Sequence, residues 1–275
     1  MTENRIMIIG GDDRQCHLCD LLLNDGYACL YENNDIGRVL TKLNKCRYIV
    51  LPVPVSRNGR HIYSKNEKFK LDIEKLLISL SKEHIVFGGG FSAEASEILN
   101  RRNIIYADIN ANEDFLIYNA YLTAQGAVNL LLSSTKKLIT GRKILITGFG
   151  RISVALAPVL RSMGAEVTIC ARNVCQLTQA ACIGFDTLML KDISKKVHLF
   201  DYIFNTVPEN IFTFSDIASI DSGATYFELA SKPYGAPATV FDELDKSYVD
   251  GSNLPGRYLS ESAGERIAEF IRKMV

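Results

Sequence analysis

Short apolar runs alternate with amphipathic segments along the first part of the chain. Such runs are typical of buried parallel strands, and the segments between them show the three-to-four-residue spacing of helices. The expected strands are residues 5–9, 27–31, 48–51, 85–87 and 104–106, and the expected helices are residues 15–24, 71–80 and 93–100. This order predicts a parallel sheet with helices on its faces.

The pattern is most informative in residues 143–172. An apolar run at residues 143–147 leads into a glycine turn, a helical pattern and a second apolar strand. This order predicts a nucleotide-binding βαβ unit. Gly148 would permit the tight turn, and Gly150 would let the backbone approach a pyrophosphate at the helix N-terminus. Ser153 stands where the fingerprint has a third glycine.

The residue that follows the second strand of this unit indicates which nucleotide it binds. Enzymes that use NAD usually have an acidic residue there for the ribose 2′-hydroxyl, but this chain has Arg172. A guanidinium offers a planar, charged fork to the 2′-phosphate, so we expect NADP; the alternative is a solvated loop arginine. Residues 206–208 follow a strand at 202–204 and should line the ribose and nicotinamide. The expected cofactor residues are Gly148, Phe149, Gly150, Arg151, Ile152, Ser153, Arg172, Thr206, Val207 and Pro208.

A long helical pattern at residues 114–133 separates the two α/β segments, and we interpret it as a helix that bridges two domains. Ser262 and Glu265 have the spacing of a capping box, which predicts the start of a last helix. We expect this helix to pack back across the hinge. The expected fold is α/β, with two doubly wound parallel-sheet domains, the second a Rossmann NAD(P)-binding domain. A cleft between them would bring nicotinamide and substrate together. The expected boundaries are 1–115 for the substrate domain, with 258–275 returning to it, 116–140 for the bridging helix and linker, and 141–257 for the Rossmann domain.

Composition and charge narrow the class of protein. The chain has 275 residues, of which 47% are hydrophobic, and equal numbers of basic and acidic residues, 31 each. This balance gives no reason to expect a nucleic-acid partner. The N-terminal apolar run is too short for a signal peptide, and no stretch approaches the length of a membrane span, so we expect a cytoplasmic protein. The seven cysteines are expected to be reduced core thiols, and Cys16 and Cys19 lack a second ligand pair, so no metal site is expected.

Six motifs carry a resemblance to a known family. They are Gly10-Gly11-Asp12-Asp13-Arg14-Gln15, Leu51-Pro52-Val53-Pro54, Ile117-Tyr118-Asn119, Gly148-Phe149-Gly150-Arg151, Asn205-Thr206-Val207-Pro208 and Leu229-Ala230-Ser231. In this order and spacing, over nearly the whole chain, the sequence resembles the A subunit of dipicolinate synthase. The resemblance implies an NADP-linked dehydrogenase that oxidises dihydrodipicolinate, or its hydroxylated tetrahydro precursor, to pyridine-2,6-dicarboxylate during endospore formation. It also implies a partner, the flavoprotein-like B subunit.

The chain departs from the family pattern at three places. The bridging helix reads Leu122-Thr123-Ala124-Gln125-Gly126, where family members tend to have proline before the threonine and glutamate before the glycine. Ser153 replaces the third glycine, and Lys232 stands where arginine is usual. Lysine keeps the charge but loses bidentate carboxylate recognition, so the departures concern the substrate contacts more than the cofactor site.

The expected reaction needs few catalytic groups. Aromatising a dihydropyridine transfers a hydride to the nicotinamide and a proton to a base or to water. The two substrate carboxylates need positive charge, for which we favour Arg14 and Lys232 because each follows a strand within a family motif; either could instead be a solvated surface charge. Asp12 would orient Arg14 or accept a proton, although helix capping is the commoner role in such a turn. Ser231 and Asn119 would hydrogen-bond the substrate or the nicotinamide amide. The other cations near expected strand ends or turns are Arg57, Arg60 and Arg257.

Other functions stay open. D-2-hydroxyacid dehydrogenases share a two-domain plan but use a histidine late in the chain, and here the last one, His198, reads as part of a surface connection. A shikimate-dehydrogenase-like or methylene-tetrahydrofolate-dehydrogenase-like enzyme would also pair a glycine turn with an arginine-type NADP site. A noncatalytic NADP-binding regulatory protein is the third alternative, because Ser153 and Gln125 weaken the motifs. The pattern does not decide between a monomer and a homo-oligomer.

Overall fold

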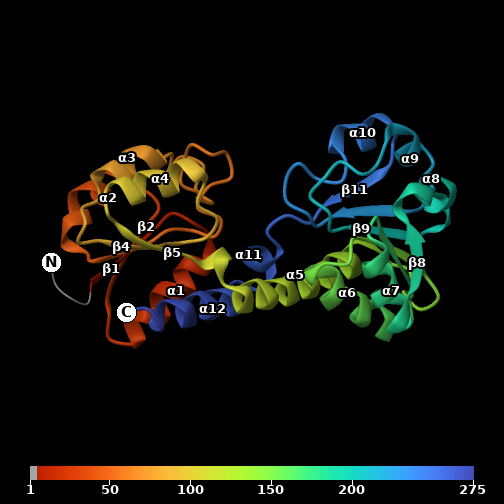
Figure 1. Cartoon of the computed structure of the whole chain (residues 1–275), viewed down its shortest axis with the longest axis horizontal. Helices are drawn as coiled ribbons and strands as arrows, with labels where there is room; N and C mark the ends of the chain where they lie inside the picture. Colours follow the sequence, from red (N-terminus) through yellow and green to blue (C-terminus); the bar gives the residue numbers. More distant parts are fainter. Residues whose placement is uncertain (1–4) are drawn as a thin grey trace. The chain divides into compact units, whose positions relative to one another are not determined.

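The computed structural model describes residues 5–275 and confirms an α/β chain with two parallel-sheet domains (Figure 1). The chain divides into two compact units. One contains the described residues up to Asn119 together with Gly256–Val275, and the other is Ala120–Pro255. Helix α5 (Glu113–Ser134) therefore begins in the first unit and ends in the second.

The first unit is built on a five-stranded parallel sheet in the order β2-β1-β3-β4-β5. Its strands are β1 (Arg5–Ile9), β2 (Ala28–Glu32), β3 (Tyr48–Val50), β4 (Ile85–Gly88) and β5 (Ile105–Asp108). Strand β2 lies on one side of β1, and the chain then returns to place β3 on the other side. The strand order therefore reverses between β1 and β3. Ligands of doubly wound sheets bind at such a reversal, beyond the carboxyl ends of the strands.

Helices cover both faces of this sheet, which is why its central strands are uniformly apolar. Met7 and Ile9 of β1 pack in one buried cluster with helices α2 (Ile36–Lys42), α3 (Ile73–Ser79) and α4 (Ala93–Arg101). Ile6 and Ile8 point to the other face, towards α1 (Asp13–Asn24) and α12 (Ser260–Arg272). The strands agree with the predicted ranges to within two residues, whereas α2 was not predicted.

The second unit contains a six-stranded parallel sheet in the order β8-β7-β6-β9-β10-β11. Counted from β6, this is the 3-2-1-4-5-6 order of dinucleotide-binding domains. The strands are β6 (Lys143–Thr147), β7 (Glu166–Ala171), β8 (Asp186–Met189), β9 (Tyr202–Asn205), β10 (Thr225–Glu228) and β11 (Ser247–Asp250). The reversal of strand order lies between β6 and β9, next to the glycine turn.

Alternate residues of the central strands of this sheet again face two helical layers. Ile144 and Ile146 pack with α5, α6 (Arg151–Ser162) and α7 (Val174–Cys182). Leu145 and Ile203 pack with α8 (Ile193–Lys196), α9 (Phe214–Ala218) and α10 (Ala238–Glu243). Helix α11 is Leu254–Tyr258, and short 3-10 helices are η1 (Leu43–Lys45), η2 (Ile109–Ala111), η3 (Leu190–Asp192) and η4 (Val197–Leu199).

The C-terminal helix α12 packs beside α1 within the first unit (Figure 1). Their close approach depends on Gly264, where an added Cβ would lie 3.0 Å from the carbonyl oxygen of Arg14. The predicted capping box of Ser262 and Glu265 is wrong. Helix α12 begins at Ser260, after an N-cap at Leu259 that makes no side-chain hydrogen bond, so both residues lie inside the helix.

Helix α5 corrects a second expectation. Its 22 residues include an 18-residue window of mean hydropathy 1.2, so this helix is long and apolar enough to cross a membrane by length and composition. The prediction that no stretch approaches a membrane span is therefore wrong. Half of the window is buried within the protein, and helices in protein cores meet the same criterion, so it is weak evidence for a membrane span.

The cysteines correct a third expectation, that all seven are core thiols. Cys46 and Cys170 are buried, as expected of core thiols, but Cys16, Cys175 and Cys182 are exposed. All seven are free thiols. Within residues 5–275, no group of three or more histidine, cysteine, aspartate or glutamate side chains is arranged to hold a metal ion.

Candidate functional site

A pocket of about 460 Å³ lies at the carboxyl ends of the central strands of the second unit. It is lined by the glycine turn after β6, the end of β7 and the loop after β9, which meet where the strand order reverses. All the predicted cofactor residues except Ser153 line this pocket. The fingerprint and the two later segments, far apart in the sequence, therefore come together in one site.

The glycine turn needs glycine at its first position. Gly148 has a φ of +81°, a conformation that other residues rarely adopt, and its N–H donates to the carbonyl oxygen of Cys170 at 2.7 Å. A Cβ on Gly148 would lie 2.9 Å from both Thr206 Oγ1 and Val207 Cγ2. Gly150 is the N-cap of α6, and a Cβ there would meet nothing within 4 Å. The backbone at Gly150 therefore faces open space at the start of a helix.

Ser153 lies behind the turn and does not line the pocket. Its side chain is fully buried, and its Oγ donates to the carbonyl oxygen of Gly148 at 2.8 Å. The same Oγ lies 3.1 Å from Thr206 Oγ1, which donates to the carbonyl oxygen of Thr147 at 2.7 Å. The residue that replaces the third fingerprint glycine is thus small enough for close packing and also braces the turn.

Arg172 lies at the rim of the pocket and forms an ion pair that the sequence did not indicate. Its Nη1 and Nη2 donate to the two carboxylate oxygens of Glu209 at 2.7 and 3.0 Å. The two side chains are 72% and 51% exposed. Glu209 directly follows the predicted segment 206–208, but only the meeting of the β7 and β9 ends reveals its position. Asn173 and Gln176 line the same pocket. Both follow the end of β7, so they would have been found if the prediction had included the first turn of α7 as well as the residue at the strand end.

A buried carboxylate lies next to this region, at the end of β10. Glu228 has no exposed surface, and its two oxygens accept four hydrogen bonds. Oε1 accepts from Asn205 Nδ2 at 2.6 Å and Ala230 N at 3.0 Å; Oε2 accepts from Tyr226 Oη at 3.0 Å and Gly235 N at 2.8 Å. Burial raises the pKa of the Glu228 carboxyl, although each of these four donors acts in the opposite direction.

The Glu228 carboxylate ties the following loop to the sheet. Its bonds to Ala230 and Gly235 bracket the predicted catalytic residues Ser231 and Lys232, whose side chains are both exposed. Asn205 extends the network, because its Oδ1 accepts a hydrogen bond from Thr147 Oγ1 at 2.6 Å. One continuous set of hydrogen bonds therefore joins the ends of β6, β9 and β10.

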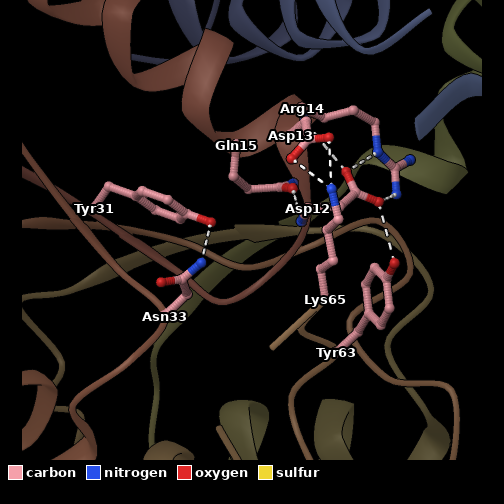
Figure 2. Close-up of polar contacts among 8 residues, drawn as sticks. All are labelled: Asp12, Asp13, Arg14, Gln15, Tyr31, Asn33, Tyr63 and Lys65. Carbon is pink, nitrogen blue, oxygen red and sulfur yellow. Dashed lines mark hydrogen bonds and ion pairs between the residues drawn. The ribbon is translucent and has the colours of Figure 1, made fainter. Parts of the chain in front are cut away.

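The other predicted catalytic residues belong to the first unit. Asp12 is the N-cap of α1 and forms a capping box with Gln15. Its carboxylate also accepts two bonds from the Arg14 guanidinium, Nε to Oδ1 and Nη2 to Oδ2, both 2.8 Å (Figure 2). Asp12 and Arg14 are 5% and 4% exposed. Asp12 therefore both caps the helix and orients Arg14, and the alternative that Arg14 is a solvated surface charge is wrong.

Tyr63 joins this group from a distant segment. Its hydroxyl donates to Asp12 Oδ2 at 3.2 Å, and burial raises the pKa of this phenol (Figure 2). The Arg57 guanidinium lies over the Tyr63 ring, 4.0 Å from its centroid. A backbone hydrogen bond holds Tyr63 beside the turn that precedes α1, because the N–H of Gly11 donates to the carbonyl oxygen of Tyr63 at 2.7 Å. Neither Tyr63 nor its stacking on Arg57 could be inferred from the spacing of residues along the chain.

The first unit also contains an ion pair and a pocket near this group. Lys65 forms an exposed ion pair with Asp13, 2.9 Å long, beside the Asp12 group. A pocket of about 750 Å³ is lined by residues between Arg57 and Lys70, which include Tyr63 but none of the predicted site residues. Asn119 is half-buried on α5. The five predicted catalytic residues thus form two groups, Asp12, Arg14 and Asn119 in the first unit and Ser231 and Lys232 in the second.

Comparison with known proteins agrees with this division into two domains. Residues 5–110 match the family model of the N-terminal domain of the dipicolinate synthase A subunit. Residues 119–229 match the NAD binding domain of S-adenosyl-L-homocysteine hydrolase. The second unit is therefore an NAD-binding domain of the Rossmann type, which indicates a pyridine nucleotide as cofactor.

Individual relatives extend the first of these matches to the whole chain. The dipicolinate synthase A subunit from Bacillus subtilis (strain 168) is 25% identical over an alignment that covers 100% of this chain and 97% of the relative. Adenosylhomocysteinase from Saccharolobus solfataricus is 28% identical over 53% of this chain and 36% of its own. The crystal structure of the dipicolinate synthase A subunit from Bacillus halodurans superposes with a TM-score of 0.82 at 23% identity, covering 98% of this chain and 97% of that one. The predicted resemblance to the A subunit of dipicolinate synthase is confirmed.

Proposed function

We propose that this chain is the A subunit of a dipicolinate synthase, an NADP-dependent dehydrogenase that oxidises dihydrodipicolinate, or its hydroxylated tetrahydro precursor, to dipicolinate. The observation that carries the proposal is the alignment with the Bacillus subtilis relative, which spans both chains almost completely. A relative that shared only the nucleotide-binding domain would support a dehydrogenase of unspecified substrate. Here the N-terminal domain, where a substrate-specific site is expected, matches the same family.

The pocket of the second unit fits a dinucleotide. Open space at Gly150 and the N-terminus of α6 suit a pyrophosphate, whose negative charge the helix dipole favours. Arg172 at the rim suits a 2′-phosphate, and residues 206–208 suit the ribose and nicotinamide. When bound, the oxidised nicotinamide accepts the hydride that leaves the substrate ring.

Each unit, taken by itself, carries polar groups that suit a dicarboxylate. Arg14 is held in one orientation by the buried Asp12 carboxylate and can be ready for a substrate carboxylate without reorganising. In the second unit, the loop that Glu228 anchors carries Lys232 and Ser231, which would offer a cation and a hydroxyl to the substrate. Asn119 would add an amide. Asp12 or water would take the proton, since aromatisation lowers the demand for a strong base.

The resemblance extends the proposal beyond the chain. We infer that its partner is the flavoprotein-like B subunit of the synthase, that it is cytoplasmic and that it forms dipicolinate during sporulation. The noncatalytic alternative predicts NADP binding without turnover of the product of dihydrodipicolinate synthase, even after the B subunit is added. Turnover under these conditions would exclude it.

The cofactor assignment is tested by exchanging Arg172 for aspartate in the intact chain. Removing a charge-assisted bond to the 2′-phosphate and adding a like charge should weaken NADPH binding by at least about tenfold, while NADH binding is retained. Arg101→Asp is a matched control, because Arg101 is also exposed and paired with a glutamate but lies in the first unit. An unchanged ratio of the two dissociation constants in Arg172→Asp would contradict the NADP assignment.

A further inference from the structure

Glu209 brings a carboxylate to the place where the second strand of the fingerprint has none. In NAD-binding units the acidic residue stands at the end of that strand, where this chain has Arg172. Glu209 follows a different strand, β9, yet its oxygens lie 2.7 and 3.0 Å from the Arg172 nitrogens, and both residues line the pocket. The pocket therefore offers a cation and an anion side by side at its rim.

The two groups favour different nucleotides. A 2′-phosphate accepts hydrogen bonds and suits the guanidinium, but it would compete with the Glu209 carboxylate for the same two nitrogens. A ribose 2′-hydroxyl can donate to a carboxylate, which a phosphate cannot do. Since the ion pair is largely exposed, it is held weakly, and exchange of one partner is easy.

We propose that Glu209 is a specificity-determining residue, which lowers the preference for NADP that Arg172 alone would give and allows NAD to bind. The inference rests on the proposed function only in requiring that this pocket binds a pyridine nucleotide. Glu209 acts in two ways. When no nucleotide is bound, it forms an ion pair with the Arg172 guanidinium, for which a 2′-phosphate must compete. When NADP is bound, it places a negative charge next to the 2′-phosphate.

The test measures the dissociation constants of NADPH and NADH for the intact chain, at low ionic strength, in the wild type and in Glu209→Gln. Glutamine keeps the length of the side chain and removes its charge. The ratio of the NADH constant to the NADPH constant should rise by about tenfold in Glu209→Gln, mainly through tighter NADPH binding. The rise should shrink in concentrated salt, because exposed charges are screened.

Glu97→Gln is the matched control, since Glu97 is an exposed carboxylate paired with an arginine in the first unit. It should leave the ratio unchanged. Nucleotide binding with an unchanged ratio in Glu209→Gln, or a ratio that moves towards NADH, would overturn the role of Glu209 while leaving the proposed dehydrogenase intact. Failure of the wild type and of both variants to bind either nucleotide would overturn the proposed function together with this inference.

Discussion

Replacing Glu228 with glutamine tests the buried network that anchors the loop after β10. The amide has nearly the shape of the carboxylate, but one of its two acceptor oxygens becomes an NH2 group. If the amide oxygen faces Asn205 and Ala230, the Tyr226 hydroxyl can rotate and accept from the NH2 group. The Gly235 N–H, which donates to Oε2 at 2.8 Å, then has no acceptor.

One buried donor without an acceptor lowers the free energy of unfolding by about 1–3 kcal/mol, so this is the expected effect of Glu228→Gln. The effect should also depend on pH. Burial raises the pKa of Glu228 in the folded state above its ordinary value of 4.5. The stabilisation that this shift gives to the wild type is complete below pH 4.5 and is lost as the pH rises through the folded-state pKa. The difference in stability between wild type and variant should therefore be largest near pH 4.5 and decrease towards neutral pH.

Urea denaturation of both proteins at the two ends of this pH range measures the effect, with equal m-values as the check that the same structure unfolds. Glu166→Gln serves as control, because Glu166 is an exposed carboxylate at the start of β7. It should change the unfolding free energy by less than about 0.5 kcal/mol. A similarly small effect for Glu228→Gln, or a difference from the wild type that does not change with pH, would refute the reasoning.

Four further substitutions test the contacts or the backbone conformation of single residues. Gly148→Ala should destabilise the protein by about 1–3 kcal/mol in thermal unfolding and weaken nucleotide binding, because Gly148 has a positive φ. In Gly150→Ala the added Cβ meets no atom, so this variant should weaken nucleotide binding without lowering stability. Equal destabilisation by the two variants would contradict this reasoning. Ser153→Ala should cost about 0.5–1.5 kcal/mol through the lost bond to Gly148, and no loss in urea denaturation would show that the brace is unimportant. Arg14→Met should cost about 3–5 kcal/mol because it leaves the Asp12 carboxylate buried without its guanidinium, and a loss below about 1 kcal/mol would argue against a buried ion pair.

Local pattern was sufficient for the strands of the first sheet and for the glycine turn, whereas β8, β10 and β11 of the second sheet were not predicted. The apolar runs of the first sheet are short and clearly bounded, so β1 was predicted at its observed limits, Arg5–Ile9. The need for glycine at position 148 follows from the strand-turn-helix order alone. By contrast, the spacing of Ser262 and Glu265 gave a false capping box, because α12 begins before them, where it packs on α1.

The features that the sequence did not predict depend on contacts between residues that lie far apart along the chain. Glu228 at the end of a strand resembles a solvated charge in the sequence, but it is fully buried, and the backbone N–H of Gly235, seven residues later, donates to it. Glu209 and Tyr63 reach Arg172 and Asp12 across 37 and 51 positions of the chain. No periodicity relates such pairs, which depend on how the ends of parallel strands meet at one edge of a sheet.

The central proposal, NADP-linked formation of dipicolinate, is tested most directly by measuring product stoichiometry. The intact chain, alone and with the B subunit, is given NADP and freshly made product of dihydrodipicolinate synthase. NADPH and dipicolinate are then quantified over time by their separate absorbance bands. Loss of one hydride per aromatised ring predicts that both appear together and in equal amounts. Dipicolinate formed without NADPH, or no dipicolinate under either condition, would contradict the proposed function.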